Sequence, residues 1–228
     1  PGLLKRVIGG HWGLAPKLGE LALSGQIEAW NLPQEVICQL FRDIAAGRPG
    51  CISRIGIGTF IEPQNAGGRL NDRSTEQLVE RVFLAGQTWL LYRAFPIHVA
   101  LLRATSADCY GNLLLDEEAV IGDVLAMAQA ARNSGGIVLA QVRKLLDKPA
   151  PPQAVKVPGI LVDRIVLADP ESHWQTMAES HNPDYCSAGN LCEPAAPGPE
   201  PLTEPARRII AERACRELQP GSICNLGI

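Results

Sequence analysis

Aromatic residues and long hydrophobic runs are both scarce in this sequence. Phe, Trp and Tyr make up 5% of the 228 residues, which argues against a platform that binds single-stranded nucleic acid by stacking its bases. Apolar runs such as 113–115 and 160–162 are far shorter than the ~20 residues of a spanning helix, so we expect no membrane partner. Positive charge is not in excess either, because the net charge is −3. We therefore expect no nucleic-acid partner.

The seven cysteines lack the spacing of a metal centre. Zinc sites usually combine cysteines about two to four residues apart with a second pair of ligands. Cys186 and Cys192 do not follow this pattern, although His173 and His181 lie near them in the sequence. We expect no metal, and we interpret the cysteines as reduced thiols of a cytoplasmic protein.

Apolar periodicity predicts an α/β protein. Near-continuous apolar strands over 99–104, 137–142 and 160–167, with a helix over 116–132 after the first, indicate an open, mainly parallel sheet flanked by helices. Further expected elements are a helix over 14–23, a strand over 27–32, a helix over 36–46, a strand over 52–60 and a hairpin over 78–93.

Composition also suggests where one domain ends. Residues 169–205 lose the apolar periodicity, and five prolines fall between 194 and 205, as is typical of an interdomain linker. We assign 1–168 to the later part of an N-terminal α/β domain. Residues 206–228 would be the opening helix and strand of a second, truncated domain, so we expect a portion of a longer protein.

Two polar segments follow predicted strands. The run Gly56-Ile57-Gly58-Thr59-Phe60 lacks the third glycine of a phosphate-binding G-x-G-x-x-G loop, which favours a tight bend. Residues 105–108 lie beyond the end of a predicted parallel strand, where ligands often bind in α/β sheets. With Asp108 and Asn112 nearby, we interpret this segment as a turn closed by polar side chains.

Several isolated polar residues could carry chemistry. Adjacent Glu117 and Glu118 point about 100° apart on a helix, so they favour stabilisation of the helix dipole over shared acid–base work. His11 and His98 have no nucleophile or acid at recognisable spacing, which favours structural roles. Gln34 stands at a strand-to-helix junction, where its amide could satisfy a free helix-start N–H or face a reacting oxygen. The residues alone favour the first of these roles.

Taken together, these segments resemble the family I CoA-transferases, especially the single-chain acetate/propionate (short-chain acyl-CoA) transferases. The resemblance covers nearly the whole chain, and the segments follow the family's order. They are GHWG at 10–13, NLPQ at 31–34, IGIGTF at 55–60 with Glu62-Pro63, GGRLN at 67–71, and the segments 103–112, 128–138, 157–159 and 207–228.

The resemblance implies two similar α/β domains that face each other across an active site. It also implies a ping-pong reaction in which a glutamate attacks an acyl-CoA and passes through an acyl-glutamyl anhydride to a glutamyl-CoA thioester. CoA is then both substrate and covalent intermediate, without a tightly bound cofactor or metal. The implied partners are an acyl-CoA, acetate or a similar carboxylate, and further copies of the chain in a homo-oligomer.

Five residues acquire roles from the resemblance. Gln34 matches the glutamine of the family's Pro-Gln-Gly motif, which implies that its amide donates to the reaction's oxyanion. Gly56, Gly58, Thr59 and Phe60 would bind the acyl group of the substrate.

Two departures from the family pattern qualify this prediction. Glu35 stands where the family usually has glycine, and we expect its side chain to point outward along the helix. The motif that carries the nucleophilic glutamate lies beyond residue 228, and no glutamate of this chain matches it. The 228 residues alone should therefore be inactive.

Two other functions remain open. A non-catalytic module of the same fold could bind CoA, an acyl group or another phosphorylated ligand, or serve in assembly. Glu35 and the missing nucleophile favour this function if the 228 residues are the natural product. A relative of the sugar-phosphate isomerases would need a cluster of lysine and acids near the strand ends, which the sequence does not provide.

Overall fold

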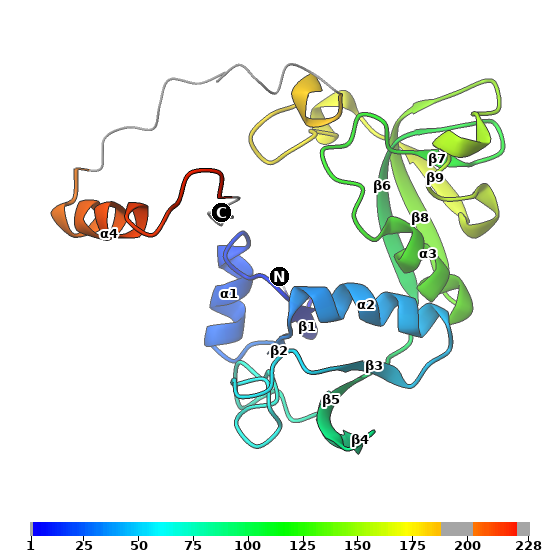
Figure 1. The fold of residues 1–228 in the computed structure, drawn as a ribbon. Coiled ribbons are helices and arrows are strands. Elements are labelled where there is room, and N and C mark those ends of the chain that lie inside the picture. Colours follow the sequence, from blue (N-terminus) through cyan, green and yellow to red (C-terminus); the bar gives the residue numbers. More distant parts are fainter. Residues whose placement is uncertain (1, 188–202, 223–228) are drawn as a thin grey trace. The chain divides into compact units, whose positions relative to one another are not determined.

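The computed structural model describes residues 2–187 and 203–222, which belong to two separate units, 1–187 and 188–228. The larger unit combines helices with three sheets, which confirms the predicted α/β class (Figure 1). Its helices are α1 (Pro16–Leu23), α2 (Gln34–Ala45) and α3 (Val124–Asn133), with single-turn 3₁₀ helices η1 (Pro152–Ala154), η2 (Gly159–Leu161), η3 (Pro170–Ser172) and η4 (Pro183–Tyr185).

The four-stranded sheet has the order β7-β6-β8-β9. Strands β6 (Val99–Ala107), β8 (Ile137–Leu145) and β9 (Arg164–Leu167) run parallel, as predicted, and β7 (Leu113–Leu114) joins β6 in the antiparallel sense. Helix α3 contacts β6 and β8. Alanines on both sides of this contact let the helix approach the sheet closely; the buried ones are Ala100, Ala104, Ala128, Ala131 and Ala140.

Two smaller sheets complete the unit. Strand β1 (Arg6–Gly9), which the apolar pattern did not predict, pairs in parallel with β2 (Glu28–Asn31). Strands β3 (Gly50–Ser53), β5 (Gln87–Arg93) and β4 (Val79–Leu84) form an antiparallel sheet in that order, which confirms the predicted hairpin.

Helix α2 buries one face against the antiparallel sheet. Its apolar residues recur at the three- and four-residue spacing of an amphipathic helix, and they pack with Leu90 and Tyr92 of β5. The buried apolar residues of the helix are Val36, Leu40 and Ile44. This packing fixes the helix whose first residue is Gln34.

The helix expected over 116–132 starts later than predicted, because two acids are drawn to the sheet. Glu117 accepts a hydrogen bond from Lys144 Nζ at 2.9 Å, and Glu118 pairs with Arg103 Nε at 2.6 Å. The assignment of these acids to the dipole of a helix was therefore wrong. Ion pairs with neighbouring strands outweigh the local preference for a first helical turn.

Two predicted strands are also shorter in the structure. The strand expected over 52–60 ends at Ser53, and the chain then turns repeatedly through residues 54–63. Glycines at 56 and 58 adopt φ angles of +98° and +80°, which extended L-residues do not take. The strand expected over 160–167 begins at Arg164, after the 3₁₀ turn η2.

The beginning of the expected linker packs on the four-stranded sheet. His173 is 3% exposed, its Nε2 lies 3.3 Å from Glu118 Oε1, and its Nδ1 lies 3.1 Å from Gln141 Nε2. Gln141 can only donate through this amide nitrogen, so His173 Nδ1 accepts and Nε2–H donates to Glu118. A neutral imidazole satisfies both bonds.

This contact makes the stability of the larger unit depend on pH. Burial, together with the charge of Arg103, lowers the pKa of His173 below its ordinary 6.5 against the opposing effect of Glu118. The unfolded chain then binds the proton more tightly, so stability is full above the unfolded-state pKa of 6.5 and declines as the pH falls from there toward the lower pKa of the folded state.

We expect the urea concentration at the midpoint of unfolding to decrease as the pH is lowered below about 6.5, the ordinary histidine pKa. His173→Gln should weaken this dependence on pH. His181→Gln, at an exposed histidine, is the control and should retain it. An equal decline with pH in both variants would contradict the assignment to His173.

The second unit is described by one helix. Helix α4 (Pro205–Cys215) carries i,i+4 ion pairs between Arg208 and Glu212 and between Arg213 and Glu217. The strand expected toward residue 228 lies outside the described residues. The assignment of 206–228 to a second domain stays a prediction.

Candidate functional site

Gln34 lies where strand β2 gives way to helix α2. Pro33 holds the extended conformation (φ −57°, ψ 131°) before the helix, and no side chain caps this helix start in the described structure. Gln34 is exposed, and its Nε2 lies 3.5 Å from Cys38 Sγ one turn later. Its position at the carboxyl end of a parallel strand pair is where α/β proteins commonly bind ligands.

Gly10 packs directly against Gln34. A Cβ built on Gly10 would lie 2.8 Å from Gln34 Cα and still closer to Oε1. Such contacts are far inside ordinary van der Waals separation, so only glycine fits here without moving Gln34. The GHWG segment thus supplies the close backbone approach that seats the glutamine.

A cavity of about 280 Å³ opens beside this contact. It brings the NLPQ segment together with the glycine-containing turn, which lie far apart in the sequence. Its walls are mainly apolar, and the Phe60 side chain is partly exposed on them. The lining residues are Gly10, Asn31, Leu32, Pro33, Ile55, Gly56, Thr59, Phe60 and Ile61. Three of the four predicted acyl-binding residues therefore line the cavity, and Gly58 does not. Gln34 is not a lining residue either, and it adjoins the cavity through its neighbours Pro33 and Gly10.

Hydrogen bonds fix the turn that forms one wall. Tyr92 Oη donates to the Ile55 carbonyl at 2.6 Å, and Thr59 Oγ1 donates to the Gly56 carbonyl at 2.7 Å. A Cβ on Gly56 would meet Tyr92 Oη at 2.7 Å. The predicted tight bend is confirmed, and the Thr59 hydroxyl is occupied in holding it.

A buried carboxylate supports the same turn. Glu62 is 5% exposed, and its Oε2 accepts from Gly58 N at 3.1 Å and from Gln64 Nε2 at 3.3 Å. Through Oε2, Glu62 forms a structural tie that sequence reasoning missed, whereas its Oε1 is buried without a hydrogen-bond partner among the described residues. In the sequence, Glu62 stands out only by its place after the glycine-containing turn, and nothing there indicates that it is buried.

Glu35 is exposed, as expected, and lines a second cavity of about 280 Å³ between α2 and β3. Ile55 lies in the walls of both cavities. Burial raises the pKa of Cys51 in the second cavity to about 11, with smaller contributions from Asp43 and Glu35. Glu35 does not line the cavity beside Gly10.

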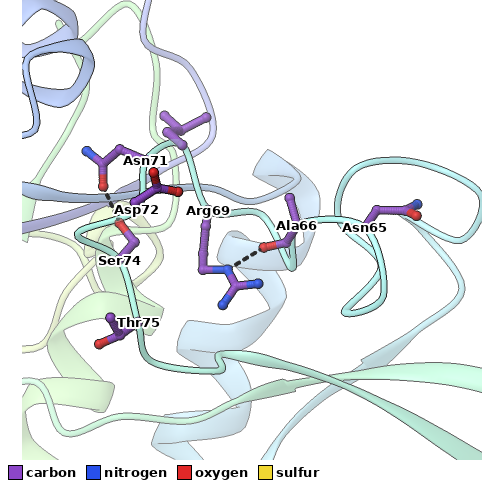
Figure 2. Close-up of a pocket in the computed structure, with 8 residues that line it drawn as sticks. Asn65, Ala66, Arg69, Asn71, Asp72, Ser74 and Thr75 are labelled. Atoms are coloured by element: carbon purple, nitrogen blue, oxygen red, sulfur yellow. Dashed lines mark hydrogen bonds between the residues drawn. The ribbon is translucent and has the colours of Figure 1, made fainter.

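A larger, polar pocket of about 560 Å³ lies along residues 65–75 (Figure 2). Arg69 Nε donates to the Ala66 carbonyl at 2.7 Å, and Ser74 Oγ donates to Asn71 Oδ1 at 2.9 Å. Asn71 Nδ2 also donates to the Ala22 carbonyl at 2.7 Å. These bonds tie the GGRLN segment to itself and to α1. Gln34 does not line this pocket.

The predicted polar turn begins later than expected, because residues 105–107 continue strand β6 and the turn starts at Asp108. Asp108 accepts hydrogen bonds from the backbone N–H groups of Tyr110, Asn112 and Ala150 and from Asn112 Nδ2, at 2.9–3.0 Å. Burial opposes ionisation, but these donors outweigh it and lower the pKa of Asp108 to about 2. The bonds from Tyr110 and Asn112 close the chain over 108–112, so the interpretation as a polar turn holds for this part of the segment.

The remaining candidates do not form a second reactive centre in the described structure. His11 and His98 are exposed. Residues 2–187 and 203–222 hold no cluster of three or more His, Cys, Asp or Glu side chains that could bind a metal. No helix in these ranges is long and apolar enough to span a membrane.

A family profile and two similar proteins all indicate a CoA-transferase. The sequence profile of the family described as "Coenzyme A transferase" matches residues 1–168. Caffeate CoA-transferase of Acetobacterium woodii is 43% identical over 230 residues, which cover 100% of this chain and 43% of that protein. Acetate CoA-transferase YdiF of Escherichia coli K12 is 38% identical, covering 100% of this chain and 42% of that protein.

The solved structures that resemble this chain include those of an acyl-CoA transferase. The apoenzyme of acyl-CoA transferase YdiF from Escherichia coli O157:H7 matches with a TM-score of 0.82 and 37% identity, over 95% of this chain and 40% of that chain. A thioester complex of YdiF with CoA matches with a TM-score of 0.83 over the same shares. The chain spans about two fifths of the length of these relatives.

Proposed function

Because this chain belongs to the coenzyme A transferase family, we propose that its complete gene product moves CoA from an acyl-CoA to a carboxylate. The observation that carries the proposal is the position of Gln34 at the junction of β2 and α2, directly after Pro33 in the wall of the apolar cavity and in contact with Gly10 of the same wall. The cavity would receive the acyl group, and the amide would face its carbonyl oxygen. We expect the protein to be a cytoplasmic homo-oligomer.

The proposed reaction is ping-pong. A glutamate carboxylate outside these 228 residues attacks the thioester carbonyl, the C–S bond breaks, and an acyl-glutamyl anhydride and CoA thiolate result. The thiolate then attacks the glutamyl carbonyl and releases the first carboxylate, which leaves a glutamyl-CoA thioester. The acceptor carboxylate reverses both steps. At each attack, negative charge develops on an oxygen that an amide N–H of Gln34 would stabilise.

For the substrate, we propose acetate or a similar short-chain carboxylate with its acyl-CoA. A relative named as an acetate CoA-transferase covers the full chain at 38% identity, which supports this assignment. CoA would serve as substrate and covalent intermediate, without another tightly bound cofactor.

A second candidate substrate is an aromatic acyl-CoA. The wall residue Phe60 is 44% exposed and could stack on an aromatic ring. A relative named as a caffeate CoA-transferase is 43% identical over the full chain. Both observations favour a larger acyl group than acetyl.

A substrate panel distinguishes these candidates. The complete gene product should be assayed with acetyl-CoA, propionyl-CoA and caffeoyl-CoA as donors and with the corresponding free acids as acceptors. A higher kcat/KM with acetyl-CoA supports the first candidate, and a higher value with caffeoyl-CoA supports the second. Binding of acyl-CoA without transfer to any acceptor would overturn both and indicate a non-catalytic binding module.

A further inference from the structure

The side chain of Cys38 contacts the amide on which the proposed function depends. Gln34, Cys38 and Arg42 recur every four residues on α2, so they share one face of the helix. Gln34 Nε2 lies 3.5 Å from Cys38 Sγ, within the range of a hydrogen bond to sulfur. The thiol therefore accepts one of the two amide protons of Gln34, and the other stays available.

Arg42, the last of these three residues, joins α2 to the start of α3. Arg42 Nη1 lies 2.7 Å from Asp123 Oδ1, at the start of α3, and 2.9 Å from the Cys38 carbonyl oxygen. Burial raises the pKa of the Cys38 thiol, with a further contribution from Asp123. The sulfur is thus a neutral thiol, held between the amide of Gln34 and the charged pair.

We propose that Cys38 is a positioning residue that fixes the Gln34 amide for oxyanion stabilisation. Gln34 is exposed, and an exposed glutamine samples several rotamers. Gly10, directly after β1, bounds the amide on one side, and Cys38 holds its nitrogen from the following turn of α2. Donors that are oriented before the reaction need no reorganisation as charge develops. The inference rests on the proposed role of Gln34.

The central test compares Cys38→Ala and Cys38→Ser in the complete gene product. Cys38→Ala removes the acceptor, and we expect kcat to fall about three- to tenfold, the effect of one neutral hydrogen bond, with KM little changed. Serine keeps a group that accepts from the amide, so kcat should return to within about twofold of the parent. Cys109→Ala, at an exposed cysteine, is the matched control and should behave like the parent.

The double variant separates positioning from a general structural effect. If Cys38 acts through Gln34, Gln34→Ala and Gln34→Ala/Cys38→Ala should have the same kcat, because no amide remains to be oriented. The proposal is overturned if Cys38→Ala lowers kcat by the same factor with and without Gln34, or if serine fails to restore it while thermal melting is unchanged.

The same variants distinguish this inference from the proposed function. If Gln34→Ala lowers kcat and Cys38→Ala does not, the positioning role fails and the proposed function stands. If Gln34→Ala itself leaves kcat unchanged, the oxyanion role of Gln34 fails, and the positioning role of Cys38 is overturned with it.

Discussion

Replacing Gln34 with alanine should lower kcat of the complete gene product by about 10²–10³-fold, the usual cost of losing one oxyanion donor. The side chain is exposed, so its removal leaves the core intact and should not shift thermal melting. KM for the acyl-CoA should change far less than kcat, because the amide acts mainly on the developing charge.

Gln39 offers a matched control on the same helix. It is also exposed, it does not line the cavity beside Gly10, and Gln39→Ala makes the same chemical change. We expect this variant to retain the kcat of the parent. Equal activity of the Gln34 and Gln39 variants would contradict the assignment of the oxyanion donor.

Replacing Asp108 with alanine should destabilise the larger unit by about 2–4 kcal/mol, because charge-assisted hydrogen bonds are lost and buried donors are left unpaired. The carboxylate holds three backbone N–H groups and the Asn112 amide. Asn112 in turn accepts from Gly159 N at 2.8 Å, so the loss extends to the chain that precedes β9. Urea unfolding at neutral pH measures the effect.

The contribution of Asp108 to stability should decrease at low pH. Since folding lowers the pKa of Asp108 from 3.8 to about 2, its contribution is full above 3.8 and disappears as the pH falls toward 2. The difference in stability between the parent and Asp108→Ala should therefore shrink in that range. Asp116→Ala, at an exposed acid, is the control. A difference that stays constant down to pH 2 would show that Asp108 acts without its charge.

The parallel sheet was predictable from the sequence because its strands carry apolar residues on both faces, although only one face of β6 and β8 is well buried in the larger unit. β6, β8 and β9 have near-continuous apolar runs, and the hairpin of β4 and β5 has the Ala85-Gly86 turn with positive φ at both residues. Strand β1 is only four residues long. Its pairing with β2 comes from tertiary contact and leaves no clear periodic signal.

The local sequence pattern gave the wrong start for α3, because ion pairs with residues distant in the sequence determine the structure there. Glu117 and Glu118 look like a helix start, yet Lys144 and Arg103 on the neighbouring strands hold them outside α3. The bend at Gly56 and Gly58 was predictable, because only glycine takes those φ angles easily.

Parts of the candidate site could not be predicted from the sequence. Spacing alone could not place the GHWG, NLPQ and glycine-containing segments around one cavity. It also gave no sign that Glu62 lies buried beneath the turn, or that Cys38 faces the Gln34 amide across one helical turn.

The proposed mechanism requires that CoA passes through a covalent bond to the protein. Intact-protein mass spectrometry of the complete gene product, before and after incubation with acetyl-CoA or caffeoyl-CoA, detects this bond. We expect a mass increase that corresponds to one CoA attached as a thioester, which the acceptor carboxylate then removes. An unchanged mass with every acyl-CoA that serves as a donor would contradict the proposed mechanism.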